Sequence, residues 1–132
     1  MSKPMILCVD DEIEILNSLK KQLKKAFGDT YLYEMAESAE EALELIEELQ
    51  EEGATNILVI VSDWLMPNMK GDELLIRIHT QFPNIVKVML TGQADETAIE
   101  RAKTQANLHY CLQKPWSTKE LVATIVSGLG KR

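Results

Sequence analysis

Cysteine is scarce in this chain: Cys8 and Cys111 are the two cysteines among 132 residues. Both lie in apolar, strand-like runs (MILCV and LHYCL), so we interpret them as small buried apolar residues. Two cysteines are too few for a cysteine-based zinc site, and their settings do not favour a disulfide.

Long apolar runs are also missing, and none approaches the length of a membrane-spanning helix. The first residues, MSKPMILCVDDE, become acidic after five apolar positions, unlike a secretory signal peptide. Basic residues are outnumbered, with 14 Lys and Arg against 21 Asp and Glu, and the formal net charge is −7. Nucleic acids and anionic membranes would repel such a chain. We therefore expect a cytoplasmic protein that contacts neither directly.

The length suits one domain, and there is no internal repeat or low-complexity tract. We expect a single domain over residues 1–132, with a core from about residue 4 to residue 129, and see no output domain. Apolar strand-like runs are predicted at residues 5–9, 31–36, 57–61, 85–90 and 108–112, alternating with helical patterns at 12–27, 38–50, 71–81, 95–104 and 117–126. This alternation predicts an α/β fold with a parallel sheet covered by helices on both faces.

Several helix boundaries have local causes. Ile13, Leu16, Leu19 and Leu23 keep helical spacing in the first helix, with lysines between them. The pairs Ser38 with Glu41, and Ser117 with Glu120, predict capping boxes. The last residues, Gly128, Gly130, Lys131 and Arg132, predict a fraying end.

The second helix carries a run of glutamates, which is either a solvated face or a docking face for a basic partner.

Polar residues follow four of the five predicted strands. Asp10 and Asp11 follow the first, Asp63 the third, Thr91 the fourth, and Lys114 ends the fifth. The carboxyl ends of parallel strands share one edge of an open α/β sheet, and ligands bind at that edge. Three carboxylates, a hydroxyl and an ammonium group are therefore predicted to converge.

Clustered carboxylates repel one another unless one takes up a proton or a cation binds. Oxygen ligands in a partly hydrated site favour Mg²⁺. With the charge neutralised, one carboxylate is free to act as a nucleophile, and a phosphoryl group is its natural target. The expected product is an aspartyl phosphate.

These residues resemble the receiver domain of two-component response regulators over essentially the whole chain. The matching motifs are V-D-D-E at 9–12, S-D-W-L-M-P-N-M-K-G at 62–71, T-G at 91–92 and K-P-W at 114–116. The resemblance implies a flavodoxin-like, doubly wound (βα)5 fold with strand order 2-1-3-4-5. It also implies a signalling domain that is not an enzyme beyond its own phosphotransfer and slow autodephosphorylation.

The resemblance also implies the roles of the site residues. Asp63 is expected to accept a phosphoryl group from a phosphohistidine on a sensor histidine kinase or a phosphotransfer protein. Thr91 and Lys114 are expected to contact that group. For Mg²⁺ the implied ligands are Asp11, Asp63 and the backbone carbonyl of Leu65, with Asp10 acting through a water molecule.

The positions around the last strand differ from the family pattern. Receivers commonly carry an aromatic switch residue three positions before the lysine, where this chain has Cys111, and strand alternation predicts that Tyr110 faces the other way. Pro115 is expected to follow a cis peptide bond, as in the family. Trp116 is either an anchor beneath the last helix or a contact residue.

The expected function is thus a phosphorylation-controlled switch. It would act on an output domain or a downstream protein through the face formed by the fourth helix, fifth strand and fifth helix, or through a phosphorylation-dependent homodimer. The alternative is a pseudo-receiver interaction module that is not phosphorylated, which Cys111 favours. A small-molecule phosphatase is disfavoured, since it would need D-x-D where this chain reads D-W-L.

Overall fold

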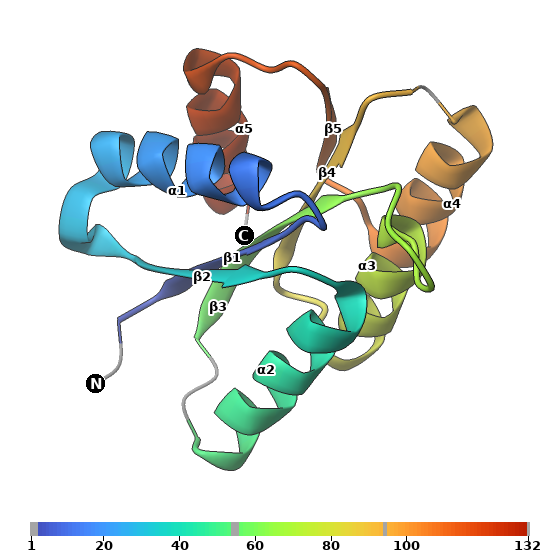
Figure 1. The fold of residues 1–132 in the computed structure, drawn as a ribbon. Coiled ribbons are helices and arrows are strands. Elements are labelled where there is room, and N and C mark those ends of the chain that lie inside the picture. Colours follow the sequence, from blue (N-terminus) through green and yellow to red (C-terminus); the bar gives the residue numbers. More distant parts are fainter. Residues whose placement is uncertain (1–2, 54–55, 94, 132) are drawn as a thin grey trace.

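The computed structural model describes residues 3–53, 56–93 and 95–131. Strands and helices alternate along the chain (Figure 1): β1 Met5–Val9, α1 Ile13–Phe27, a short 3-10 turn Gly28–Thr30, β2 Leu32–Ala36, α2 Ala39–Glu51, β3 Ile57–Asp63, α3 Gly71–Gln81, β4 Val86–Thr91, α4 Glu96–Ala106, β5 Tyr110–Gln113 and α5 Thr118–Gly130. Every element predicted from the sequence is present, with ends that shift by a few residues.

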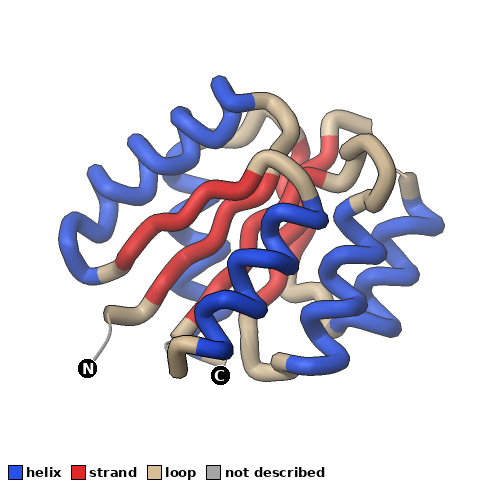
Figure 2. Tube along the Cα trace, turned by 60° about the horizontal axis from the view of Figure 1, so that its bottom comes forward, coloured by secondary structure: helices blue, strands red, loops and turns tan. Residues whose placement is uncertain are grey.

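The five strands form one parallel sheet in the order β2-β1-β3-β4-β5, which confirms the predicted flavodoxin-like fold. Helices α1 and α5 cover one face of the sheet, and α2, α3 and α4 cover the other (Figure 2). Within the described ranges, no helix combines the length and the apolar character that crossing a bilayer requires.

Each face of the sheet has its own apolar core. On one face, Leu19, Leu23 and Ile125 of α1 and α5 pack against strand residues such as Val59 and Val88. On the other face, the helices contribute residues such as Leu74 and Ala102. The central strand β3 is almost wholly buried, in keeping with its continuous apolar sequence. Ile13 of α1 does not join the core, since its side chain is 56% exposed.

The two predicted capping boxes differ in the structure. Ser117 and Glu120 form both reciprocal bonds at the start of α5. Ser38 accepts a hydrogen bond from the Glu41 backbone at 3.0 Å, but no return bond from the Glu41 side chain is found in the described part of the chain. The start of α2 therefore has half of the predicted box.

The prediction of a fraying end was wrong for Gly128 and Gly130, while Arg132 lies outside the described residues. Helix α5 continues to Gly130, and Gly128 is buried. A Cβ atom at Gly128 would lie 2.5 Å from Cγ1 of Val86 and 3.0 Å from the His109 ring. The absence of a side chain thus lets the last turn of α5 approach the sheet closely.

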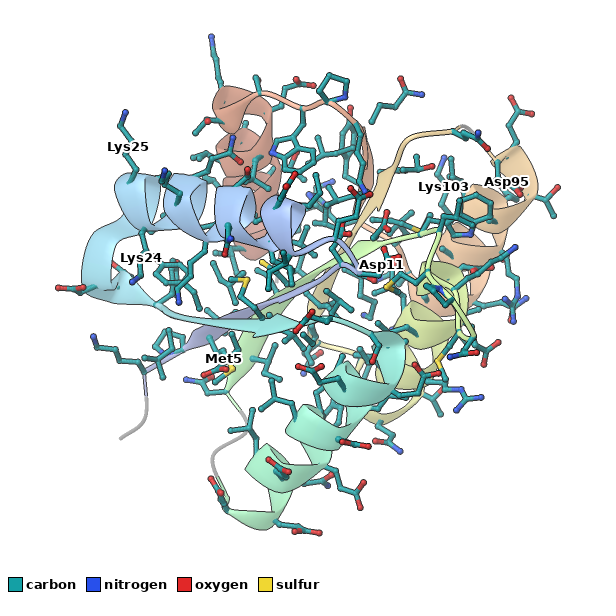
Figure 3. The ribbon with its side chains drawn as sticks, in the orientation of Figure 1. Met5, Asp11, Lys24, Lys25, Asp95 and Lys103 are labelled. Carbon is teal, nitrogen blue, oxygen red and sulfur yellow. The ribbon has the colours of Figure 1, made fainter. Side chains whose placement is uncertain are left out.

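Charge is distributed unequally between the two faces. Helix α1 carries four lysines and one glutamate, and two of the lysines, Lys24 and Lys25, are labelled in Figure 3. Helix α2, on the opposite face of the sheet, carries six glutamates and no basic residue.

Candidate functional site

The carboxyl edge of the sheet gathers the polar residues that the sequence placed at the strand ends. β1 leads into Asp10 and Asp11, β3 ends at Asp63 and β4 ends at Thr91. Because β3 lies between β1 and β4, these ends are neighbours, and Asp11 is seen in the loop between β1 and α1 (Figure 3). Lys114 follows β5 and reaches across the edge toward β3 and β1.

Lys114 holds two of the carboxylates together. Its Nζ lies 3.0 Å from Oδ1 of Asp63 and 3.1 Å from Oδ2 of Asp10. Both carboxylates are buried, while the Lys114 side chain is 18% exposed. The three groups come from positions up to 104 residues apart, so the fold itself creates the ion pairs. An ammonium group at this place is suited to holding an oxygen of a phosphoryl group on Asp63.

Burial sets the titration of this cluster. It raises the pKa of Asp63 to about 6, although hydrogen bonding to Lys114 offsets part of the effect. Burial also raises the pKa of Asp10, against the opposing effects of the Glu12 N–H group and Lys114. Burial by itself would lower the pKa of Lys114, but its pairing with Asp63 and Asp10 outweighs this and raises it. A second cation would favour the ionised carboxylates further.

An acidic cluster beside this ion pair could hold that cation. Oxygens of Asp10, Asp11 and Glu12 all lie within 4.8 Å of one another, and Asp11 and Glu12 are exposed. An all-carboxylate donor set with solvent access fits Mg²⁺. Glu12 was missed as a candidate in the sequence, although it directly follows the two aspartates. Asp10 has one oxygen bonded to the Glu12 N–H at 2.9 Å and the other paired with Lys114.

Thr91 is buried at the end of β4, with its hydroxyl already engaged. The hydroxyl donates to the Gln93 carbonyl and accepts from the Gln93 N–H at 3.1 Å. The carbonyl of the preceding residue, Leu90, accepts from the Trp64 N–H at 2.8 Å, which ties the β4 end to the segment after Asp63. The single hydroxyl proton of Thr91 is thus used by the Gln93 carbonyl, and donating it to a group on Asp63 would require this hydrogen bond to break.

The segment after Asp63 turns sharply into α3. The Gly71 N–H donates to the Trp64 carbonyl at 2.8 Å, and a Cβ atom at Gly71 would lie 2.2 Å from the Asp63 carbonyl oxygen. Only glycine fits so close to another backbone segment. Leu65 lies inside this turn with its side chain 55% exposed. In the described part of the chain, no backbone N–H donates to the Leu65 carbonyl.

The K-P-W segment is fixed from two sides. The Lys114–Pro115 peptide bond is cis, as expected. The indole N–H of Trp116 donates to Oε1 of Gln22 on α1 at 2.9 Å, and its half-buried ring packs on the α1–α5 side of the sheet. These contacts favour the anchor interpretation of Trp116.

Tyr110 and Cys111 point in opposite directions from β5, as strand alternation predicts. The Tyr110 side chain is 54% exposed. Cys111 is half-buried and packs with the core beneath α3 and α4, and burial raises the pKa of its thiol. A small thiol thus lies where the family commonly has an aromatic ring.

Comparison with known proteins agrees with this geometry. The family model described as the response regulator receiver domain matches residues 6–126. The hybrid signal transduction histidine kinase D of Dictyostelium discoideum is 30% identical over 128 residues, which are 96% of this chain and 8% of that protein. The chain therefore spans a small part of that relative's length.

Solved structures match over nearly the whole chain. A CheY-like response regulator receiver domain protein from Methanospirillum hungatei JF-1 aligns with a TM-score of 0.85 and 30% identity, covering 98% of this chain and 96% of that one. The beryllofluoride-activated NtrC4 receiver domain dimer aligns with a TM-score of 0.81 and 28% identity, covering 96% and 97%. From the family match over residues 6–126 we conclude that the chain belongs to the response regulator receiver domain family.

Proposed function

We propose that residues 1–132 form a phosphoacceptor receiver domain, which takes a phosphoryl group from a phosphohistidine onto Asp63. The observation that carries this proposal is the Lys114 ammonium group held between Asp63 and Asp10 at the carboxyl edge of the sheet. A buried nucleophilic carboxylate with a cation 3.0 Å away can bear the added negative charge of a phosphoryl group.

In the proposed transfer, an oxygen of Asp63 attacks the phosphorus atom and the P–N bond to the donor imidazole breaks. The bonding electron pair leaves with the imidazole, which takes up a proton from solvent. Lys114 holds one phosphoryl oxygen, and the Thr91 hydroxyl, once released from Gln93, donates a hydrogen bond to another.

Mg²⁺ is the proposed cofactor, and when bound it would neutralise the carboxylates and the transferring group. Asp11, Asp63 and the Leu65 carbonyl would be its direct ligands. Asp10 would act through a water molecule, since the Glu12 N–H and Lys114 already occupy its two oxygens. The donor would be a sensor histidine kinase or a phosphotransfer protein.

The proposed output is a change of the α4-β5-α5 face that alters binding to an output domain, a downstream protein or a second copy. Tyr110 on β5 and Val126 on α5 are both 54% exposed, which leaves apolar surface on two of these elements. The dimeric state of the activated NtrC4 receiver is consistent with this use of the fold.

Incubation with acetyl phosphate and Mg²⁺ tests the proposal directly. Mass spectrometry should find one hydroxylamine-sensitive phosphoryl group per chain in the wild type and none in Asp63→Asn. Asp29→Asn is the matched control, since Asp29 is exposed in the turn between α1 and β2. It should be labelled like the wild type.

The competing function is a pseudo-receiver that binds partners without phosphorylation, and the observation favouring it is Cys111 at the switch position. A wild type that binds Mg²⁺ but forms no adduct would decide for this alternative. Labelling that survives in Asp63→Asn would place the acceptor elsewhere.

A further inference from the structure

Helix α4 is attached to the body of the protein by unusually small side chains. Its buried face consists of Ala98, Ala102 and Ala106, with Ile99 partly buried. Alanine buries little apolar surface, so this face contributes little to holding the helix in place. The main neighbour of α4 is α3 (Figure 1).

Arg101 adds a specific link between these two helices. Its Nη1 lies 2.9 Å from Oδ2 of Asp72, and its Nη2 lies 2.9 Å from Oε1 of Glu73. Asp72 is buried, and it belongs with Glu73 to the first turn of α3. Across the described ranges, these two are the only salt bridges that α4 makes to another element. We call these two ion pairs the Arg101 clamp.

The α3 end of the clamp lies next to the strand end that carries Asp63. Asp72 directly follows Gly71, whose N–H donates to the Trp64 carbonyl at 2.8 Å and whose backbone lies close to the Asp63 carbonyl. The first turn of α3 is therefore in direct backbone contact with the end of β3.

The amino end of α4 is also close in sequence to Thr91, the second residue of the site that this helix can affect. Asp95 caps the helix, accepting from the Ala98 N–H at 3.0 Å. Gln93, two residues earlier, holds the Thr91 hydroxyl. When Thr91 donates to a phosphoryl group instead, the Gln93 backbone loses this partner two residues before the α4 cap. A clamp that fixes the middle of α4 to α3 would oppose a movement of α4 that follows from this loss.

We propose that the Arg101 clamp holds α4 in its resting position and so sets the cost of switching, an inference that rests on the proposed function. Arg101 is a positioning residue here, acting through α4 on Thr91. In this proposal the phosphorylation site is coupled to α4 through α3, without an aromatic residue at position 111.

The test uses beryllofluoride, which stands in for the phosphoryl group on Asp63, with Mg²⁺ present. Arg101→Gln should bind it more tightly than the wild type, by roughly two- to fivefold, because partly exposed ion pairs contribute modestly. Arg101→Lys keeps the positive charge but loses the two separate N–H groups that meet Asp72 and Glu73, so its affinity should fall between the two. Amide hydrogen exchange without beryllofluoride should be faster in α4 of Arg101→Gln and unchanged in α1.

Arg77→Gln is the matched control. It removes the Arg77 pair with Glu73 within α3, at 2.9 Å, and leaves the link to α4 in place. It should bind beryllofluoride like the wild type. A merely structural role for Arg101 would lower the free energy of unfolding without tightening beryllofluoride binding, which urea unfolding of the same variants would reveal.

Two results would overturn the clamp alone: equal beryllofluoride affinity in Arg101→Gln and the wild type, or weaker binding in the variant. A wild type that gives no beryllofluoride response at all would overturn the proposed function together with the coupling. In that case faster exchange in α4 of Arg101→Gln would still identify the clamp as a structural tie, so the two failures are distinguishable.

Discussion

Lys114 and Lys87 are two lysines with opposite surroundings in this fold. Lys114 lies between two carboxylates, which raise its pKa. Lys87 on β4 is 1% exposed, and its Nζ donates to the carbonyls of Ile85 at 2.7 Å and Pro83 at 3.3 Å. No carboxylate in the described ranges pairs with it, and burial lowers the pKa of Lys87 to about 8. The charge of Lys114 is balanced by the carboxylates of the site, whereas the buried charge of Lys87 lowers the stability of the folded protein.

Replacing Lys87 by methionine should therefore stabilise the protein at neutral pH, by about 1–3 kcal/mol once the lost hydrogen bonds are counted. Between about pH 8 and the unfolded pKa of 10.5, the unfolded chain binds more protons than the folded one. The stability of the wild type should thus rise with pH in this window, and the advantage of Lys87→Met should shrink. Urea unfolding at about pH 7 and about pH 10 measures both.

Lys21→Met is the control, because Lys21 is exposed on α1. Its effect on the free energy of unfolding should be small and equal at the two pH values. An advantage of Lys87→Met that stays constant with pH would contradict the assignment of the cost to the buried charge.

At the scale of elements, the contact of α3 with the end of β3 controls the placement of Asp63. Gly71→Ala would push a Cβ atom against the Asp63 carbonyl, a backbone atom that cannot rotate away. We expect a loss of about 1–3 kcal/mol in the free energy of unfolding. Acetyl phosphate labelling of Asp63 should slow as well, because its strand end is displaced.

Gly130→Ala provides the comparison for this prediction. Gly130 ends α5, is exposed, and has nothing within 4 Å of an added Cβ. Alanine there should be neutral or slightly stabilising, since it favours the helix. Equal stability and labelling of the two variants would refute the close-approach argument.

The elements themselves could be predicted because their causes are local. Apolar periodicity marked the strands and helices, and the position of polar residues at strand ends marked Asp63, Thr91 and Lys114. The end of α5 could not be predicted, since the close approach of Gly128 to Val86 and His109 depends on how the helix packs on the sheet. The Arg101 clamp joins residues 28 and 29 positions apart, and so depends on how two helices pack. Glu12 was missed because its proximity to Asp10 depends on the conformation of the loop.

For the whole molecule, the site should be linked to global stability. A cation that binds the folded state alone stabilises it by about 2.7 kcal/mol at a hundred times its Kd. We expect Mg²⁺ to raise the Tm of the wild type in a concentration-dependent manner. Asp11→Asn should lose most of this rise, because Asp11 is an exposed carboxylate of the cluster at the carboxyl edge and a proposed direct ligand of Mg²⁺.

Differential scanning calorimetry with a Mg²⁺ titration measures this linkage. Asp29→Asn, which changes an exposed acid far along the chain from the cluster, should respond like the wild type. A full Mg²⁺ response in Asp11→Asn would exclude Asp11 as a ligand.

Helix α1, with four lysines, and helix α2, with six glutamates, cover opposite faces of the sheet (Figure 2), so these helices add a charge asymmetry to the net negative charge of the protein. A charged partner would turn the protein before touching it, presenting α1 to an acidic surface and α2 to a basic one. This orienting torque acts over a Debye length of about 8 Å at physiological ionic strength. Added salt should therefore slow the association of a charged partner more than it speeds dissociation. The orientation of the protein before contact would be lost as the salt concentration rises.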